Sequence, residues 1–255
     1  MRGNAATTGV GNNLAMPPKP KAAPADAPVN LREACIAAAH AVIAEQGLEA
    51  LSLREVARNL GVSHQAPYKH YASRDHLLAA VVARCFEQFA DYLKSRISRV
   101  DAPDEMLTMG RSYLRYASEH PLEYRLMFGT PWPDTTEHPQ VAEHARLAFD
   151  VLRQGLTRQH GDQADRARVE SDALFIWASL HGLASITQSN AMEQIGVLQK
   201  VIRAAPEYTL ARISDAMTNT PPRQISTPYL GGCEPNRGIE SSAAGSKGSS
   251  RKSFG

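Results

Sequence analysis

Apolar side chains recur every three or four residues through most of the chain between residues 30 and 218. This is the spacing of positions on one face of an α-helix. No stretch of the sequence shows the alternation of apolar and polar residues that is typical of a β-strand. The pattern therefore predicts an all-α fold.

Helix start and stop signals divide this region into segments. A first helix is expected to begin after Asn30, with Glu33 three places later, and to end at Gly47. Pro121 at a first helical position and Gly129 just beyond a helix end bound a short helix in the same way. The spacing predicts further helices over about 74–97, 103–120, 136–160, 164–188 and 206–217.

Capped helix starts crowd into residues 51–75. Ser52 and Glu55 have the spacing of a capping box, in which each satisfies an amide of the other. Gly61 ends this short helix, and Ser63 caps the next one. Ser73 caps a third start. Two short helices around one glycine are typical of a DNA-reading helix-turn-helix.

The charge pattern agrees with this interpretation. Between Val56 and Arg74 there is no acidic residue, whereas Arg58, Lys69 and Arg74 are cationic. Such a strip can face phosphate, and the free amides at helix starts add a partial positive charge. Amphipathic helix pairs also occur in proteins that never bind DNA, and three cations can form only a solvated face.

The segment LSLREVARNLGVSHQAPYKHYASRDHLL resembles the N-terminal domain of TetR-type transcriptional regulators. The resemblance runs from about Leu31 to about Leu78. Pro67 departs from it, because many members carry another apolar residue there. Since its missing amide falls at the edge of the first turn, we expect the recognition helix to form.

The resemblance implies roles for individual residues. His64 and Gln65 would point at base edges in the major groove, and Ala66 would offer a methyl group to thymine. The residues expected to contact phosphate are Ser52, Tyr68, Lys69, His70 and Arg74. The alternative for each is an exposed polar residue without a role in DNA binding.

Composition bounds the rest of the chain. Its 255 residues, 43% hydrophobic content and net charge of +2 suit a soluble protein. No apolar run has membrane-spanning length and no secretory signal is evident, so we expect no membrane partner and a cytoplasmic location. Cys35, Cys85 and Cys233 are too few and too scattered for a disulfide framework or a thiolate metal site. The expected division is a disordered tail at 1–28, a DNA-binding domain at 29–75, an effector-binding and dimerisation domain at 76–218, and a disordered tail at 219–255.

A second motif lies in the segment 164–188. Its WASLHG resembles the Trp-His-Gly signature of one TetR C-terminal subgroup. Trp177 and His181, one helical turn apart, suit a pocket wall, although they can equally be core and a satisfied buried imidazole. The expected pocket is largely apolar and takes a small, largely apolar effector; its candidates are Met109, Tyr113, Tyr116, Met127, Phe128, Phe149, Leu152, Trp177 and His181.

One helix-turn-helix contacts one DNA half-site, so the resemblance implies a homodimer on a palindromic double-stranded operator. The family's interface would use the helices at about 164–188 and 206–217. Its candidates are Ala178, Gly182, Leu210, Ile213 and Met217. We therefore predict a repressor that a small molecule releases.

Two other classes remain open. An enzyme is disfavoured because no nucleophile elbow, phosphate-binding glycine loop or recognisable carboxylate pair is present, and we expect no catalytic residue and no cofactor. A metal-responsive regulator could use His138 and His144 with His120 or His181. The spacing of six between His138 and His144 does not match the one-turn spacing of helical zinc ligands, so we expect no metal site.

Overall fold

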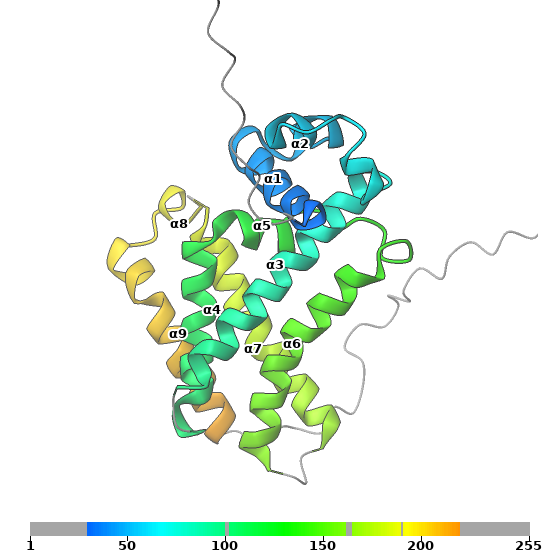
Figure 1. Cartoon of the computed structure of the whole chain (residues 1–255). Coiled ribbons are helices and arrows are strands. Elements are labelled where there is room, and N and C mark those ends of the chain that lie inside the picture. Colours follow the sequence, from blue (N-terminus) through cyan, green and yellow to red (C-terminus); the bar gives the residue numbers. More distant parts are fainter. Residues whose placement is uncertain (1–29, 100–101, 162–164, 190, 220–255) are drawn as a thin grey trace, which may run out of the picture.

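The computed structural model describes residues 30–99, 102–161, 165–189 and 191–219, and the regular structure within these ranges is helical throughout. A small head contains α1 (Leu31–Gln46), the 3₁₀ helix η1 (Leu48–Ala50), α2 (Leu53–Leu60) and the 3₁₀ helix η2 (Pro67–Lys69). The larger body is built from α3 (Arg74–Ile97), α4 (Ala102–Glu119), α5 (Pro121–Phe128), α6 (Pro139–His160), α7 (Arg166–Thr187), α8 (Ala191–Gln194) and α9 (Gln199–Asn219). The predicted all-α fold with a small N-terminal head is confirmed (Figure 1). The expected tails lie outside the described residues, except for Asn219 at the end of α9.

Helix α3 connects the head with the body. It spans the predicted residues 74–97, and the hydroxyl of Ser73 caps it by accepting a hydrogen bond from the amide of His76 at 3.2 Å. Its first turns bury Leu77 and Leu78, and its later turns bury Phe86 and Phe89. It packs against α1 in the head and against α4, α5 and α6 in the body. One helix thus contributes side chains to the core of both parts.

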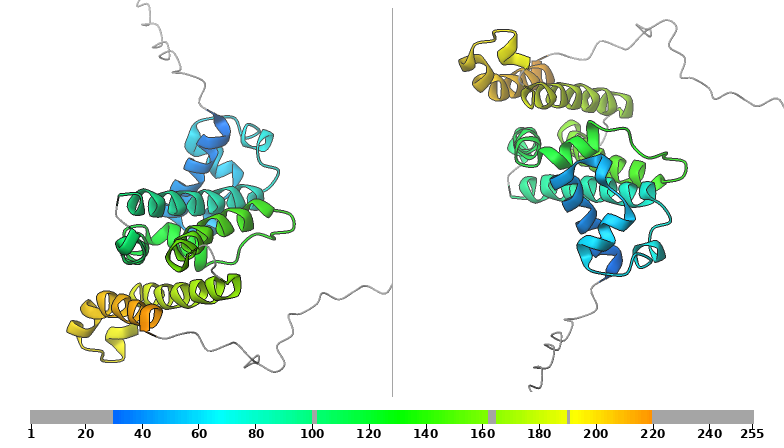
Figure 2. Two further views of the ribbon diagram at one scale, coloured as in Figure 1. Left: turned by 90° about the horizontal axis from the view of Figure 1, so that it is seen from below. Right: turned by 90° about the horizontal axis from the view of Figure 1, so that it is seen from above.

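The body has two layers. Figure 2 shows α7 and α9 side by side on one side of the body, with α3, α4 and α6 on the other. The layers meet where α4 and α6 pack on α7. The side chains between them surround the cavity described below.

The segment before α3 corrects one prediction. Residues 64–66 form a turn and Pro67–Lys69 a 3₁₀ helix, instead of a continuous α-helix. Pro67 has no amide to donate to the carbonyl of Ser63, so this carbonyl accepts from the amide of Ala66 at 2.9 Å. The tighter bonding pattern continues to His70, whose amide donates to Pro67.

Two helix boundaries and one short helix also differ from prediction. Helix α6 begins at Pro139, because a turn held by Asp134 occupies the preceding residues: Asp134 accepts hydrogen bonds from the amide and hydroxyl of Thr136, both at 2.8 Å. Helix α9 begins at Gln199 and continues through Pro206, which had been expected at its start. The short helix α8 was not predicted.

Candidate functional site

The first part of the site is the surface formed by α2 and the segment up to α3. Ser52 caps α2 as predicted, since its hydroxyl accepts from the amide of Glu55 at 3.1 Å. The reciprocal half of the capping box is wrong: the carboxylate of Glu55 pairs with Arg58 and accepts from Gln46. Gly61 ends the helix in the left-handed conformation, with φ of 66°.

The residues predicted to read bases and to hold phosphate lie together on this surface. His64 and Gln65 are exposed and Ala66 is half-buried. Tyr68, Lys69 and His70 are exposed as well, whereas Ser52 is half-buried at the start of α2. Their contacts with DNA remain predictions.

Arg74 stabilises the structure of the head, a role that the sequence did not indicate. Its guanidinium donates to the carbonyl of Leu51 at 3.1 Å and to that of Leu48 at 2.9 Å. These bonds fasten the turn between α1 and α2 to the first residue of α3. A phosphate contact by Arg74 would compete with them.

Tyr71 holds the head from the other side. It is buried, as predicted, and its hydroxyl donates to the carbonyl of Arg32 at 3.0 Å. Burial raises the pKa of this hydroxyl. The segment 64–70, which is exposed except at Ala66 and Pro67, is therefore anchored at both ends, by Tyr71 after it and by the capped helix α2 before it.

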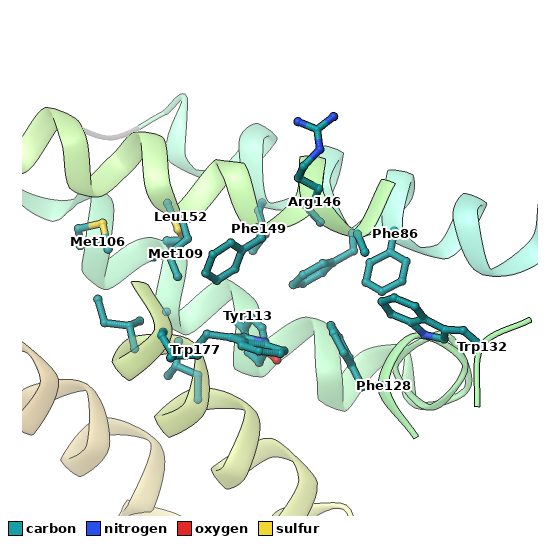
Figure 3. A pocket seen from close by; sticks show the side chains of 18 residues that line it. Phe86, Met106, Met109, Tyr113, Phe128, Trp132, Arg146, Phe149, Leu152 and Trp177 are labelled. Atoms are coloured by element: carbon teal, nitrogen blue, oxygen red, sulfur yellow. The ribbon is translucent and has the colours of Figure 1, made fainter. Parts of the chain in front are cut away.

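The second part of the site is a cavity of about 470 Å³ between α3, α4, α6 and α7 (Figure 3). The predicted candidates that line it are Met109, Tyr113, Phe128, Phe149, Leu152 and Trp177. Helix α3 adds Phe86 and Phe89, which were not predicted although they share its apolar face. Trp132, from the loop before α6, also lines it and donates its indole N–H to the carbonyl of Met127 at 2.8 Å.

The main cavity is almost wholly apolar. The charged residue in its lining is Arg146, and Figure 3 shows its guanidinium directed away from the other lining side chains. Arg146 lies 3.6 Å from a carboxylate oxygen of Asp150 one turn along α6. This agrees with the expected preference for an apolar ligand.

A smaller second cavity of about 390 Å³ adjoins the first. Phe128, Trp132 and Trp177 line both and form their common wall. Met127 and His181, predicted for the main cavity, line this second one together with Thr130.

Tyr116 is the one predicted candidate that lines neither cavity. It is buried against Phe89 on α3 and against His120, with ring centroids 4.9 and 4.4 Å away. Its position on the inward face of α4 was predicted correctly, but that face extends past the cavity. Tyr116 therefore belongs to the core between α3 and α4.

Two tyrosines and His181 form a buried polar cluster beside the common wall. Nδ1 of His181 lies 2.7 Å from the hydroxyl of Tyr124 and 3.5 Å from that of Tyr113, and the two hydroxyls are 2.9 Å apart. Burial lowers the pKa of His181 and raises the pKa of Tyr124 to about 12. At neutral pH the cluster is uncharged.

The histidines considered for a metal are dispersed. His138 is buried at the start of α6 with its ring against that of His76. His144 bonds through Nδ1 to the carbonyl of Gln140, and His120 packs on Tyr116. Within the described ranges, no three His, Cys, Asp or Glu side chains lie close enough together to hold a metal ion.

The predicted dimer residues divide into two groups. Leu210 and Ile213 on α9 are only 5% and 9% exposed, because they pack inside the chain; a Cβ on Gly110 of α4 would overlap the side chain of Leu210. Because these two side chains are buried within their own chain, they are not available to contact a partner, and both predictions are wrong. Met217 is half-buried, whereas Ala178 is exposed and a Cβ on Gly182 would meet open space.

An exposed apolar strip does follow α7. Phe175 and Ile186 are 46% and 42% exposed and lie on the same side as Ala178 and Gly182, at the spacing of one helical face. On α9, Tyr208 and Val201 are also exposed. The helices expected at the interface thus carry apolar surface, but through different side chains from those predicted on α9.

None of the helices in the described part of the chain is both long enough and apolar enough to cross a membrane.

Two family models match the chain. Residues 36–81 match the family described as bacterial regulatory proteins, tetR family, and residues 106–209 match the tetracyclin repressor-like C-terminal domain. The first covers most of the head and the start of α3, and the second runs from within α4 to about the middle of α9. Phe86 and Phe89 of the cavity lie between the two matched segments.

The chain is similar to the HTH-type transcriptional regulator Rv1816 of Mycobacterium tuberculosis, with 32% identity over 92 residues; the match covers 35% of this chain and only 39% of that relative. It is also 25% identical over 137 residues to the HTH-type transcriptional activator FasR of Mycolicibacterium smegmatis. That match covers 52% of this chain and 61% of the relative. Among solved structures, a protein of unknown function from Rhodococcus sp. RHA1 aligns with a TM-score of 0.59 and 25% identity, over 74% of this chain and 97% of the other.

Proposed function

We propose that this chain, which belongs to the TetR family of transcriptional regulators, is a homodimeric repressor that a small, largely apolar effector releases from a palindromic operator. The observation that carries the proposal is the continuity of α3. Its first residue, Arg74, fastens the head, and its later residues Phe86 and Phe89 line the cavity. With 24 residues it is about 36 Å long, so a small tilt at the cavity moves the head by several ångströms.

The effector would act by shifting a population. A ligand between α3 and α7 contacts Phe86 and Phe89 directly. It therefore stabilises the position of α3 in which the cavity best accommodates the ligand. A second contact links the same regions: Nε2 of His40 on α1 lies 2.9 Å from the carboxylate of Glu123 on α5, the helix that ends in Phe128. Movement at the cavity wall therefore reaches the head by two routes.

Dimerisation supplies the second head that a palindrome requires. The exposed strip on α7, with Phe175 and Ile186, is the proposed contact with the second copy, and Tyr208 on α9 would extend it. Alpha-helical pairs from two subunits can then form a four-helix interface. A DNA-binding role also accords with the cytoplasmic location expected from the sequence.

Repression is the proposed sign of regulation because the C-terminal family model is described as tetracyclin repressor-like. FasR, which is named an activator, represents the opposite sign among the relatives. We also propose that Trp177, His181 and Gly182 place the C-terminal domain in the Trp-His-Gly subgroup. The position of Trp177 and His181 at the two cavities supports a functional reason for the motif.

The decisive test of DNA reading is selection of binding sites from random duplex DNA with the purified protein. We expect a palindrome to be enriched. Gln65→Ala should relax one base position in each half-site, at a cost of about 1–3 kcal/mol for the preferred base, because a side chain that reads a base edge discriminates by that amount. Lys69→Ala should weaken binding to all sequences alike and reduce the salt dependence, because it removes a phosphate contact.

Lys200→Ala is the matched control, since Lys200 is exposed on α9 and remote from the head. It should leave both the selected sequence and the affinity unchanged. If no sequence is enriched, or if Lys200→Ala weakens binding as much as Lys69→Ala, the proposed reading surface is wrong.

A further inference from the structure

In the polar cluster of Tyr113, Tyr124 and His181, the donor and the acceptor of each hydrogen bond can be assigned. The hydroxyls of Tyr113 and Tyr124 are both buried, and each needs an acceptor for its hydrogen. If Nδ1 of His181 carried a hydrogen, three hydrogens would compete within a triangle of three atoms, and one hydroxyl would have no acceptor there. With Nδ1 bare, Tyr113 donates to Tyr124 and Tyr124 donates to Nδ1, which satisfies both hydroxyls.

The neutral imidazole of His181 therefore carries its hydrogen on Nε2. The contact of Nε2 within the described residues is the hydroxyl of Ser185, at a long distance of 3.4 Å. A donor with so weak a partner can turn its hydrogen bond toward a ligand. His181 lines the second cavity, and so does Thr130. The hydroxyl of Thr130 already donates to the carbonyl of Leu126 at 3.2 Å.

The two cavities differ in chemistry but share a wall. The main one is surrounded by hydrocarbon and aromatic rings, and its polar atoms are already bonded or directed outward. The second one has the imidazole of His181 in its lining. Since Phe128 and Trp177 border both, a molecule with its body in the first cavity can place one end group in the second.

Charge selects the kind of end group. Arg146 points away from the main cavity and lies beside Asp150, so it does not offer its charge to a ligand inside. Burial lowers the pKa of His181, which keeps the imidazole neutral at pH 7. A carboxylate in the second cavity would meet no cation, because the residues that line it include no lysine or arginine.

We propose that the effector is an amphipathic molecule with an apolar body in the main cavity and a neutral hydrogen-bond acceptor, such as a ketone, ester or ether oxygen, that binds Nε2–H of His181 in the second. This inference rests on the proposed function for the role of the ligand, but the binding site itself does not depend on DNA.

Isothermal titration calorimetry of the full-length protein with three matched probes tests the proposal. The probes share one ring system: 2-acetylnaphthalene carries a neutral acceptor, 2-isopropylnaphthalene has the same shape without it, and 2-naphthoate carries an anion. We expect 2-acetylnaphthalene to bind about 3- to 10-fold more tightly than 2-isopropylnaphthalene, the range of one neutral hydrogen bond. The anion should bind more weakly than either.

Variants locate the preference at His181. His181→Phe keeps an aromatic ring but removes the donor, so it should abolish the difference between the two neutral probes while still binding 2-isopropylnaphthalene. His181→Gln, which restores an N–H donor, should recover part of the difference. Ser185→Ala removes the weak partner of Nε2, so it should preserve or increase the preference for 2-acetylnaphthalene. Because this variant keeps Tyr113, Tyr124 and His181, it also tests the inference if His181→Phe does not fold.

Three results would overturn the inference: equal affinity of wild type for the two neutral probes, tightest binding of 2-naphthoate, or loss of the preference in Ser185→Ala. Absence of binding by all three probes would also overturn it and would remove the cavity as an effector site. Selection of an operator by the same preparation would still establish the DNA-binding function, so the two failures are distinguishable.

Discussion

Single residues in the head combine roles that the sequence cannot separate. A cation next to a helix start in a basic segment predicts a phosphate contact, and Arg74 fits this description. The structure shows that its guanidinium is bonded to the carbonyls of Leu48 and Leu51. Only the backbone path of η1, which brings those carbonyls to the start of α3, reveals the difference from Lys69, which is exposed.

This difference predicts unequal effects of the two residues on the free energy of unfolding. Arg74→Met should lower the free energy of unfolding by about 1–3 kcal/mol, because two carbonyls lose a charged donor. Lys69→Met should change it by less than about 0.5 kcal/mol, as expected for an exposed surface residue. Urea denaturation of the two variants measures both values, and equal stability of the pair would contradict the structural role of Arg74.

His181 predicts how stability depends on pH. Its pKa is lowered by burial in the folded chain, so between that value and the ordinary value near 6.5 the unfolded chain binds more protons. The free energy of unfolding is therefore highest above about pH 6.5 and falls as the pH is lowered through the folded pKa. His181→Gln should flatten this part of the profile between about pH 8 and pH 5. His64→Gln, at an exposed histidine of the head, is the control, and an unchanged slope in His181→Gln would refute the assignment.

At the scale of elements, the sequence predicted best where local signals determine the structure. The limits of α3 and α5 were correct because Ser73, Pro121 and Gly129 act within one helical turn of themselves. The recognition helix was predicted wrongly because the missing amide of Pro67 was expected to have little effect at the edge of the first turn. In the structure the carbonyl of Ser63 accepts from the amide of Ala66 instead, and a 3₁₀ helix follows. Helix α9 begins before Pro206 and packs against α4 and α7, so Pro206 lies inside the helix despite its cost to helix formation.

The cap of α3 gives a prediction at this scale. Ser73→Ala should reduce the free energy of unfolding by about 1 kcal/mol, since the amide of His76 loses its side-chain acceptor. Ser73→Asp should keep most of the stability, because a carboxylate caps equally well and favours the positive end of the helix. Guanidinium denaturation compares the two, and similar losses in both variants would show that the cap contributes little.

At the scale of the whole molecule, α7 and α9 carry apolar side chains on more than one side, so the sequence could not separate residues of the chain's own core from residues of a surface proposed to meet a partner. One face fills the chain's own core, as Leu210 and Ile213 do, and the other is exposed, as Phe175 and Ile186 are. The cavity was predicted more fully, because six of its aromatic and aliphatic side chains lie on faces already identified as inward. Phe86, Phe89 and Trp132 were missed, since their proximity to α7 depends on the packing of distant segments.

The exposed face predicts the oligomeric state. Phe175→Asp and Ile186→Asp should each convert the proposed dimer to monomer and weaken operator binding at least tenfold, because a charge would be buried against the partner. Leu147→Asp changes a leucine on α6 that is 43% exposed, close to the exposure of those two residues, and should leave the dimer intact. Sedimentation velocity distinguishes the species. A wild-type monomer, or dissociation by Leu147→Asp as well, would exclude this interface.

The two tryptophans of the chain, Trp132 and Trp177, both border the two cavities. All indole emission from the protein therefore originates beside the proposed effector, and none originates in the head. A change in its intensity or wavelength on adding a small molecule reports occupancy of the cavities without any attached dye. With labelled operator in the same cuvette, effector binding and DNA release can be timed separately. Their order distinguishes a ligand that captures the free regulator from one that displaces the regulator bound to DNA.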